Sequence, residues 1–284
     1  MSQVPIAPGP DSHAGGEEEL VILTAEHPGF LDVEYRQRRN RIARTALDYV
    51  AGSAVPDVEY TESEHGVWRE VWKHLRELHV RHACREYLEG AENVRLPSDR
   101  IPQLEEINRT LAAHGRFRLA PVAGLVSGRM FLSYLARHTF LSTQYIRHHS
   151  VPLYTPEPDV VHELVGHVPT FAHPAFVETT VILGEAAVRA HDEATIAQIA
   201  RLYWYTLEFG VVEERGALKA AGAGLLSSFG ELGRFRTAPE LVPFDAEVAA
   251  KTPYDPTDYQ AKLFVSPSFE AMTSGIVRYL ERLA

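Results

Sequence analysis

The residues best suited to chemistry lie in one short stretch, where two histidines bracket a glutamate: His162-Glu163-Leu-Val-Gly-His167. The histidines are five residues apart, whereas those of the H-E-x-x-H zinc-protease motif are four apart. On an ideal α-helix, residues five apart point about 140° away from each other, at about 100° per residue. They can share a metal only if the helix is distorted, which Gly166 and Pro169 would allow. Spacing alone therefore leaves two interpretations open, a metal site and a helix with two hydrogen-bonded histidines.

A third ligand is offered by Glu208, which lies in the apolar and aromatic run Leu202-Tyr-Trp-Tyr-Thr-Leu-Glu208. A carboxylate in such surroundings is costly to bury without a partner. Two imidazoles and one carboxylate on one face of a metal, with open positions opposite, are typical of oxygen-using iron sites. The alternative for Glu208 is a solvent-facing position on an amphipathic helix. Four other glutamates lie in more polar stretches and are weaker candidates: Glu178, Glu185, Glu213 and Glu214.

The elements that must position these residues are mostly helices. Thr61-Glu-Ser-Glu64 has the pattern of a capping box, and the apolar spacing after it predicts a helix ending near Gly90. Strand signals are few and short, at 117–119, 151–154 and 263–265. The residues from 1 to 18 are rich in Pro, Gly, Ser and Glu, and we expect them to be disordered. Further helices are predicted over 101–111 with a stop at Gly115, over 131–135, 174–189 and 194–212, and from 268 onwards.

Composition excludes several classes of protein. The net charge of −10 and the lack of a Lys/Arg-rich run argue against a nucleic-acid binder. No window approaches the roughly 18–20 apolar residues of a membrane span. The N-terminus lacks a basic segment followed by an apolar one, so we expect a cytoplasmic protein. The single cysteine, Cys84, rules out an internal disulfide, and we expect it to be a buried structural thiol.

Several blocks, in the right order, resemble the catalytic domain of the pterin-dependent aromatic amino acid hydroxylases. The resemblance begins near Trp68 and covers about three quarters of the chain. It implies a single, mostly α-helical catalytic domain over 19–284 with a few short β-strands. Besides the histidine motif, the blocks are His82-Ala-Cys84, Ile101-Pro-Gln-Leu-Glu105, Phe117-Arg-Leu-Ala-Pro-Val-Ala-Gly124, Thr143-Gln-Tyr-Ile-Arg-His148, Tyr203-Trp-Tyr-Thr-Leu-Glu208-Phe-Gly and Gly222-Ala-Gly-Leu-Leu-Ser227-Ser-Phe-Gly-Glu231.

The resemblance implies roles for individual residues. His162, His167 and Glu208 match the family's iron(II) ligands, which settles the third ligand. A planar guanidinium suits a substrate carboxylate, because it donates two parallel hydrogen bonds. The residues that match the family's amino-acid site are Arg147, Thr155 and Ser227, with Asp159 fixing the arginine and Trp204 and Pro158 beside the substrate ring.

The tetrahydropterin side of the family's site corresponds to Gly124, Leu125, Val126, Phe131 and Glu163. Phe131 would stack on the flat pterin ring, and Glu163 would interact with the pterin through water. In a zinc hydrolase, Glu163 would instead be a general base.

Three positions depart from the family's common pattern and bear on the substrate: Gly128 in place of a serine, Ala221 in place of a tyrosine, and Pro256 in a loop that helps to separate substrates. We expect O₂-dependent hydroxylation of phenylalanine to tyrosine, the usual activity of short relatives. Hydroxylation of tryptophan, or of phenylalanine at another ring position, is the alternative. A zinc-dependent hydrolase and a catalytically silent binding fold are alternatives of another class. The chain has no room for the regulatory domain and tetramerisation helix of animal relatives, so we expect a monomer.

Overall fold

The computed structural model describes residues 20, 22–114 and 117–283, so the segment 1–18 and Gly115 lie outside the described residues. As predicted, helices dominate and the strands are short. The helices, including two π-helices (η), are α1 (Val33–Leu47), α2 (Glu62–His82), α3 (Arg85–Val94), α4 (Leu104–His114), α5 (Gly128–Leu135), η1 (His162–His167), α6 (Val168–Phe171), α7 (Pro174–Arg189), α8 (Glu193–Tyr203), η2 (Trp204–Glu208), α9 (Ala223–Ser227), α10 (Phe229–Arg234), α11 (Ala246–Lys251) and α12 (Phe269–Leu283). The strands are β1 (Arg118–Pro121), β2 (Thr139–Ser142), β3 (Val211–Glu214), β4 (Ala217–Ala220), β5 (Glu240–Pro243) and β6 (Lys262–Ser266).

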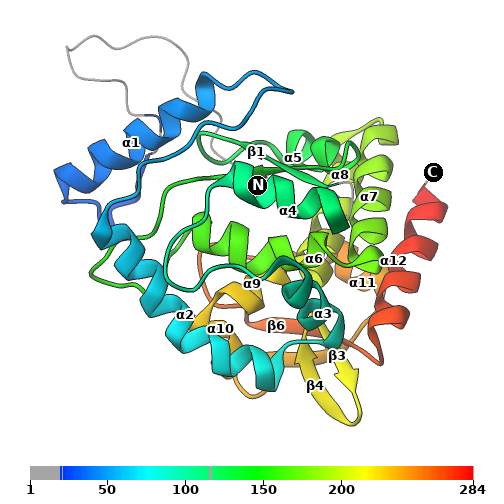
Figure 1. The fold of residues 1–284 in the computed structure, drawn as a ribbon. Coiled ribbons are helices and arrows are strands. Elements are labelled where there is room, and N and C mark those ends of the chain that lie inside the picture. The colour runs from blue at the N-terminus through cyan, green and yellow to red at the C-terminus, as the bar shows by residue number, and fades with distance from the viewer. Residues whose placement is uncertain (1–19, 21, 115–116, 284) are drawn as a thin grey trace.

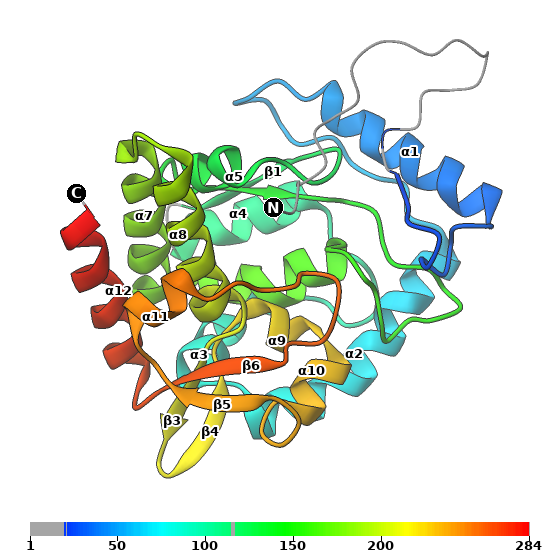
Figure 2. The ribbon, with the colours of Figure 1, turned by 180° about the vertical axis from the view of Figure 1, so that it is seen from behind.

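Two small sheets flank the helices. Strands β1 and β2 form a parallel pair, and the larger sheet has the order β4-β3-β6-β5. Within it, β3 runs antiparallel to β4 and parallel to β6. In Figures 1 and 2, α7, α8 and α12 lie together on one side of the molecule and α1 lies on the opposite side. The larger sheet lies at one end, below the central helices.

One large apolar core runs through the helices and the larger sheet. Its aromatic side chains include Phe117 and Phe171, whose rings stack with their centroids 4.4 Å apart. Leu164 and Val165, in the middle of η1, are completely buried in this core. Packing of these two side chains therefore fixes the middle of the backbone segment that carries the two motif histidines. The expected burial of Cys84 is confirmed.

The helix predicted after Thr61 begins where expected but is two helices. The capping box is formed, because the Thr61 side chain accepts from the Glu64 N–H and the Glu64 carboxylate accepts from the Thr61 N–H. The predicted end near Gly90 is wrong, since α2 ends at His82. The Cys84 N–H instead donates to the Ala220 carbonyl at 2.9 Å, and this pairing with the end of β4 breaks the helix.

Pairing with distant parts of the chain also decides where other predicted helices and strands end. The helix over 174–189 and the strands near 118 and 263 are confirmed. The helix over 194–212 is wrong at its end, because Val211 pairs with Ala220 in β3. The strand at 151–154 is also wrong. There the Val151 N–H donates to the His148 carbonyl and the Tyr154 N–H to the Val151 carbonyl, each at 3.2 Å, so the chain turns.

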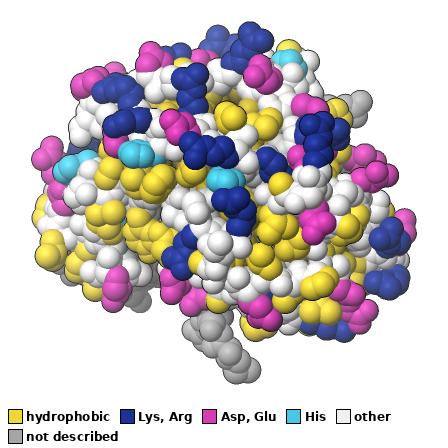
Figure 3. Space-filling model, turned by 90° about the horizontal axis from the view of Figure 1, so that it is seen from below, with side chains coloured by type: hydrophobic (Ala, Val, Ile, Leu, Met, Phe, Trp, Pro, Cys, Tyr) yellow, Lys and Arg dark blue, Asp and Glu magenta, His cyan; other side chains and the backbone are white. Residues whose placement is uncertain are grey.

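The surface is mixed in charge. On the face in Figure 3, basic and acidic side chains are interspersed rather than gathered by sign. Among the described residues, no helix is both long and apolar enough to cross a membrane.

Candidate metal and amino-acid site

The two motif histidines lie at the ends of a π-helix, η1, rather than on an α-helix. A π-helix bonds each residue to the one five positions along, so residues five apart lie much closer to the same face than they do on an α-helix. This reduces the 140° mismatch that an α-helix would impose on His162 and His167. Glu208 is the last residue of the second π-helix, η2. Two rare π-helical segments thus supply all three candidate ligands.

The donor atoms of these three residues converge. The two Nε2 atoms of His162 and His167 are 3.1 Å apart. Glu208 places Oε1 2.9 Å from Nε2 of His167, and Oε2 3.7 Å from Nε2 of His162. Neighbouring ligands about 2.1 Å from a six-coordinate metal lie on the order of 3 Å apart. The donor set therefore fits a divalent metal such as iron(II).

Ser227, at the end of α9, orients the first histidine. Its hydroxyl donates to the Ala223 carbonyl at 2.8 Å, so its oxygen is left to accept from Nδ1–H of His162 at 2.9 Å. This places the ring proton on Nδ1 and leaves the lone pair of Nε2 for a metal. Burial lowers the pKa of His162 to about 4, which also favours the neutral imidazole.

Glu208 is buried but remains ionised. Burial alone would raise its pKa, but the imidazoles of His167 and His162 outweigh this effect and lower it. The Tyr203 hydroxyl also donates to the carboxylate. Phe131 packs its ring edge-on against Tyr203, with the centroids 5.4 Å apart. A chain of contacts therefore links α5 to the carboxylate of the site.

Glu163 is the other carboxylate close to the two histidines, and a ligand atom of each of the three residues lies within 4.8 Å of the others. Its Oε1 accepts from the Thr143 N–H at 3.2 Å and from the Thr143 hydroxyl at 3.0 Å. Burial raises the pKa of Glu163 to about 8 despite these bonds. Glu208, whose carboxylate oxygens lie 2.9 and 3.7 Å from the two histidine Nε2 atoms, is the better third ligand.

Arg147 and Asp159 form a buried pair at the start of η1. Nε and Nη2 of Arg147 donate to the two carboxylate oxygens at 2.9 and 2.8 Å. The carboxylate also accepts from the Arg147 N–H at 2.8 Å and from the His162 N–H at 3.1 Å. Burial would raise the pKa of Asp159, but Arg147 outweighs it and the pKa is lowered. The Nη1 donors take no part in this pairing, so they are free to bind a ligand carboxylate.

The residues expected beside the substrate ring lie on separate segments. Trp204 begins η2, donates from Nε1 to Oε1 of Gln260 at 2.9 Å, and stacks on Tyr254 with the centroids 4.1 Å apart. Pro158 is half-buried in the loop before η1. Thr155, in the same loop, is half-buried and donates its hydroxyl to the Glu157 carbonyl at 3.0 Å. The loop is thus internally ordered next to Asp159.

Apart from Glu163 on η1, the residues expected to hold the pterin lie on the loop between β1 and α5 and on the first turn of α5. A Cβ added at Gly124 would meet nothing within 4 Å, and Leu125 is 72% exposed. Phe131 is half-buried and also contacts Phe140 edge-on, with the centroids 5.7 Å apart. Val126 is half-buried in the same loop. This region can accommodate a flat ligand, because it has open space beside Gly124, an exposed Leu125 and a half-buried Phe131 ring.

Two glycines allow the backbones around the metal site to approach closely. A Cβ on Gly166 would lie 2.7 Å from the Ala223 carbonyl oxygen, and one on Gly222 would lie 2.2 Å from the Glu208 carbonyl oxygen. Both contacts are with backbone, which cannot move aside. These positions bring α9 against η1 and η2, and so bring Ser227 to His162.

Sequence reasoning assigned no role to three residues that complete the site: Tyr203, Thr143 and Tyr254. Tyr203 and Thr143 lie within blocks that carry the resemblance, but no signal in the sequence names Glu208 and Glu163 as their partners. Tyr254 carries no motif, and only its stacking on Trp204 reveals it.

The donor set defines a class, because two histidines and one carboxylate on one face are the usual ligands of non-heme iron oxygenases. Comparisons with known proteins are more specific. A family model described as biopterin-dependent aromatic amino acid hydroxylase matches residues 18–284. The chain therefore belongs to the biopterin-dependent aromatic amino acid hydroxylase family, as the sequence predicted.

Individual relatives agree with this assignment. The chain is 46% identical over 266 residues to tyrosine 3-monooxygenase of Canis lupus familiaris, covering 92% of this chain and 54% of that protein. It is 45% identical over 254 residues to phenylalanine-4-hydroxylase of Caenorhabditis elegans, covering 87% of this chain and 55% of that protein. The chain thus spans about half the length of the curated relatives it matches.

The fold agrees with a solved relative. Phenylalanine hydroxylase of Chromobacterium violaceum, with bound iron(III) and oxidised 7,8-dihydrobiopterin, superposes with a TM-score of 0.75 at 29% identity, covering 85% of this chain and 90% of that one. The predicted cofactors, iron and a tetrahydropterin, agree with the family and with the contents of that structure.

Proposed function

We propose that this protein hydroxylates the ring of an aromatic amino acid, phenylalanine in the first place, using iron(II), a tetrahydropterin and O₂. The observation that carries the proposal is the convergence of Nε2 of His162, Nε2 of His167 and the Glu208 carboxylate at 2.9–3.7 Å, next to the Arg147–Asp159 pair. Two of the proposed metal ligands and a charged anchor for an amino acid thus lie on one short segment of chain, and Glu208 joins them from η2.

In this proposal, His162, His167 and Glu208 hold the iron. When bound, iron and tetrahydropterin together supply the activation of O₂, of which one oxygen atom goes to the ring and the other accepts two electrons from the pterin. The protein's part is to keep the His162 imidazole neutral and the Glu208 carboxylate charged. Ser227 does this for His162 through Nδ1, and Tyr203 helps to orient the Glu208 carboxylate.

Arg147 would act by position. Its guanidinium is held rigidly by Asp159, and its free Nη1 donors would bind the carboxylate of the amino acid. Anchoring one end of a rigid substrate fixes which ring carbon faces the metal, and such orientation contributes strongly to rate. We propose that Trp204 and Pro158 contact the ring and that Thr155, in the same loop as Pro158, also binds the substrate.

On the opposite side, we propose that Gly124, Leu125, Val126 and Phe131 hold the flat pterin. The exposed Leu125 and the open space at Gly124 support this placement. Glu163 would bind the pterin through water. Its raised pKa supports a protonated carboxyl that can donate a hydrogen bond to that water.

The choice of amino acid is a proposal within the family. The relatives named above act on tyrosine or on phenylalanine, so both must be tested along with tryptophan. Family membership argues against the zinc hydrolase and the silent fold. The monomeric state and the cytoplasmic location also remain proposals.

The test is hydroxylation by the iron-loaded protein. Purified protein is loaded with iron(II) without oxygen, then mixed with tetrahydropterin and air in the presence of phenylalanine, tyrosine or tryptophan. We expect mass spectrometry to show one added oxygen atom on phenylalanine, with the retention time of tyrosine, only when iron and pterin are both present. No product from any of the three, at confirmed iron occupancy, would contradict the proposal.

A further inference from the structure

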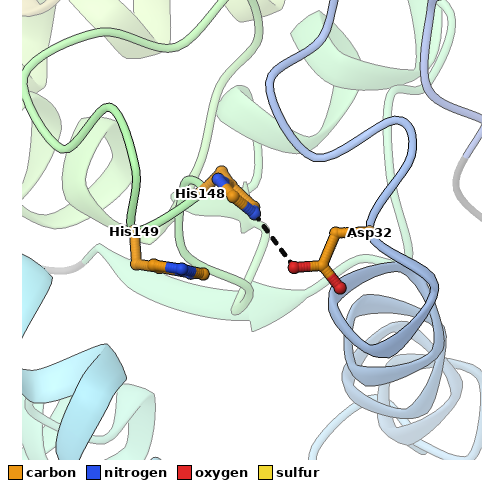
Figure 4. Close-up of side chains that lie close together, drawn as sticks. All are labelled: Asp32, His148 and His149. Atoms are coloured by element: carbon orange, nitrogen blue, oxygen red, sulfur yellow. Dashed lines mark hydrogen bonds and ion pairs between the residues drawn. The ribbon is translucent and has the colours of Figure 1, made fainter.

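A second cluster of metal-ligating side chains lies outside the site described above. It consists of Asp32, the residue before α1, and His148 and His149, which follow Arg147 directly. Figure 4 shows the three side chains turned toward a common space, with a dashed line between His148 and Asp32. One ligand atom from each residue lies within 4.8 Å of the others. None of the three belongs to the proposed iron ligands.

The spacing suits a small divalent cation. Nε2 of His148 and Oδ2 of Asp32 are 3.2 Å apart. Two ligands about 2.0–2.1 Å from a tetrahedral zinc ion lie roughly 3.3 Å apart, so this pair already has the spacing of two zinc ligands. His149 is exposed, and its side chain is free to move the remaining distance. The two imidazole rings lie with their centroids 4.3 Å apart.

Neighbouring groups hold the two inner ligands in place. Oδ1 of Asp32 accepts a hydrogen bond from the Tyr35 N–H at 3.0 Å. Oδ2 therefore faces the histidines. Nδ1 of His148 lies 2.7 Å from the Ser150 hydroxyl, which can accept a hydrogen bond from Nδ1–H and leave the Nε2 lone pair outward. Without a metal, Nδ1 can instead accept from the Ser150 N–H at 3.3 Å while Nε2–H donates to Asp32. Metal binding would require the tautomer with the proton on Nδ1 of His148.

The cluster is built at a surface, with one ligand buried and two accessible. The side chain of His148 is 9% exposed and that of Asp32 is 34% exposed. The Tyr35 ring packs edge-on against His148, with the centroids 4.8 Å apart, and closes the inner side. The Tyr35 N–H and His148 lower the pKa of Asp32, so its carboxylate is charged at neutral pH. A cation can therefore enter from solvent, and water can complete its coordination.

We propose that Asp32, His148 and His149 form a second metal site, which takes a divalent transition-metal cation of the zinc type. Imidazole and carboxylate are suitable ligands for such ions. The site joins two segments far apart in sequence, the start of α1 and the residues next to Arg147. A bound ion fastens α1 to the segment that carries the proposed substrate anchor.

The test counts zinc ions rather than activity. The protein is dialysed to equilibrium against Zn²⁺ alone, and bound metal is measured. We expect about two Zn²⁺ per chain, and about one after either His149→Ala or Asp32→Asn. Asn caps a helix as well as Asp does, so Asp32→Asn leaves α1 intact. The matched control is His191→Ala, an exposed histidine outside these clusters, which should retain about two.

A second readout separates this site from the proposed iron site. Glu208→Ala should remove one zinc ion and leave the other on Asp32, His148 and His149. In that variant, zinc at about 100 times its Kd should raise the melting temperature by roughly 5 °C, and His149→Ala should abolish the shift. Equal zinc binding by wild type, His149→Ala and Asp32→Asn would overturn the second site. If only Glu208→Ala failed to lose zinc, the proposed iron site would be wrong and the second site would stand.

Discussion

The buried pair of Arg147 and Asp159 allows the most quantitative prediction, through the substitution Asp159→Asn. The two carboxylate oxygens accept four hydrogen bonds, three from Arg147 and one from the His162 N–H. Asn is nearly isosteric, so no cavity forms, but its NH₂ group cannot accept and must face donors. The guanidinium, 3% exposed, is then left without a counter-charge. Breaking a buried pair in this way costs about 3–5 kcal/mol of unfolding free energy.

The same substitution should also weaken binding of the substrate carboxylate. A hydrogen bond to a charged group is worth about 1.5–3 kcal/mol, so a displaced Arg147 should lower kcat/KM roughly 10- to 150-fold. The assays are urea unfolding of the iron-loaded protein and steady-state hydroxylation of phenylalanine. Phenylalanine amide lacks the carboxylate, and its kcat/KM should fall much less.

The control is Asp192→Asn, at the exposed N-cap of α8, where Asn caps equally well. Its unfolding free energy should stay within about 0.5 kcal/mol of wild type. If Asp159→Asn unfolds like wild type and retains its kcat/KM for phenylalanine, Asp159 does not position Arg147 and the reasoning is refuted.

Three further predictions address the metal site and the core. Ser227→Ala leaves Nδ1–H of His162 unbonded, and iron(II) affinity, measured by titration without oxygen, should fall about 10- to 100-fold; unchanged affinity would exclude this role. Gly222→Ala places a Cβ 2.2 Å from the Glu208 carbonyl oxygen, so urea unfolding should show a loss of about 3 kcal/mol or more, unlike a harmless Gly→Ala change at the open position Gly233. Burial lowers the pKa of His79 to about 4, so the unfolded state binds the extra proton between pH 6.5 and 4 and stability is lost as pH falls through that window. The contribution of His79 to this loss should be roughly 3 kcal/mol, so the loss should be smaller by that amount in His79→Gln; equal slopes of unfolding free energy against pH would contradict it.

Local signals in the sequence were sufficient where a helix is stabilised by its own residues. The capping box at Thr61 and the proline at the first position of α7 predicted both helix starts correctly. Local periodicity did not predict where a helix ends when a residue far along the chain pairs with that end. Ala220 pairs with both Cys84 and Val211, so it ends one predicted helix and replaces the end of another with a strand. Neither effect can be read from a window of neighbouring residues.

At the metal site, too, the sequence predicts some features and only the three-dimensional structure shows the others. The residue types and the blocks of resemblance predicted His162, His167 and Glu208, and the structure brings their donor atoms together. Their convergence depends on two π-helices, and π-helical hydrogen bonding has no simple sequence signature. The partners that hold the ligands, such as Tyr203, came only from the three-dimensional arrangement. The sequence predicts the ligands. It does not predict the geometry that keeps the Glu208 carboxylate charged, keeps the His162 imidazole neutral and aligns the three donor atoms.

We propose that this protein inserts an oxygen atom from O₂ into an aromatic amino acid. The most direct measurement is a single reaction of the iron(II)-loaded protein with tetrahydropterin, phenylalanine and ¹⁸O₂, followed by mass spectrometry of the amino acid. We expect one ¹⁸O atom in the product, and none when iron or pterin is left out. Product oxygen that came from water, or product formed equally well without iron, would contradict it.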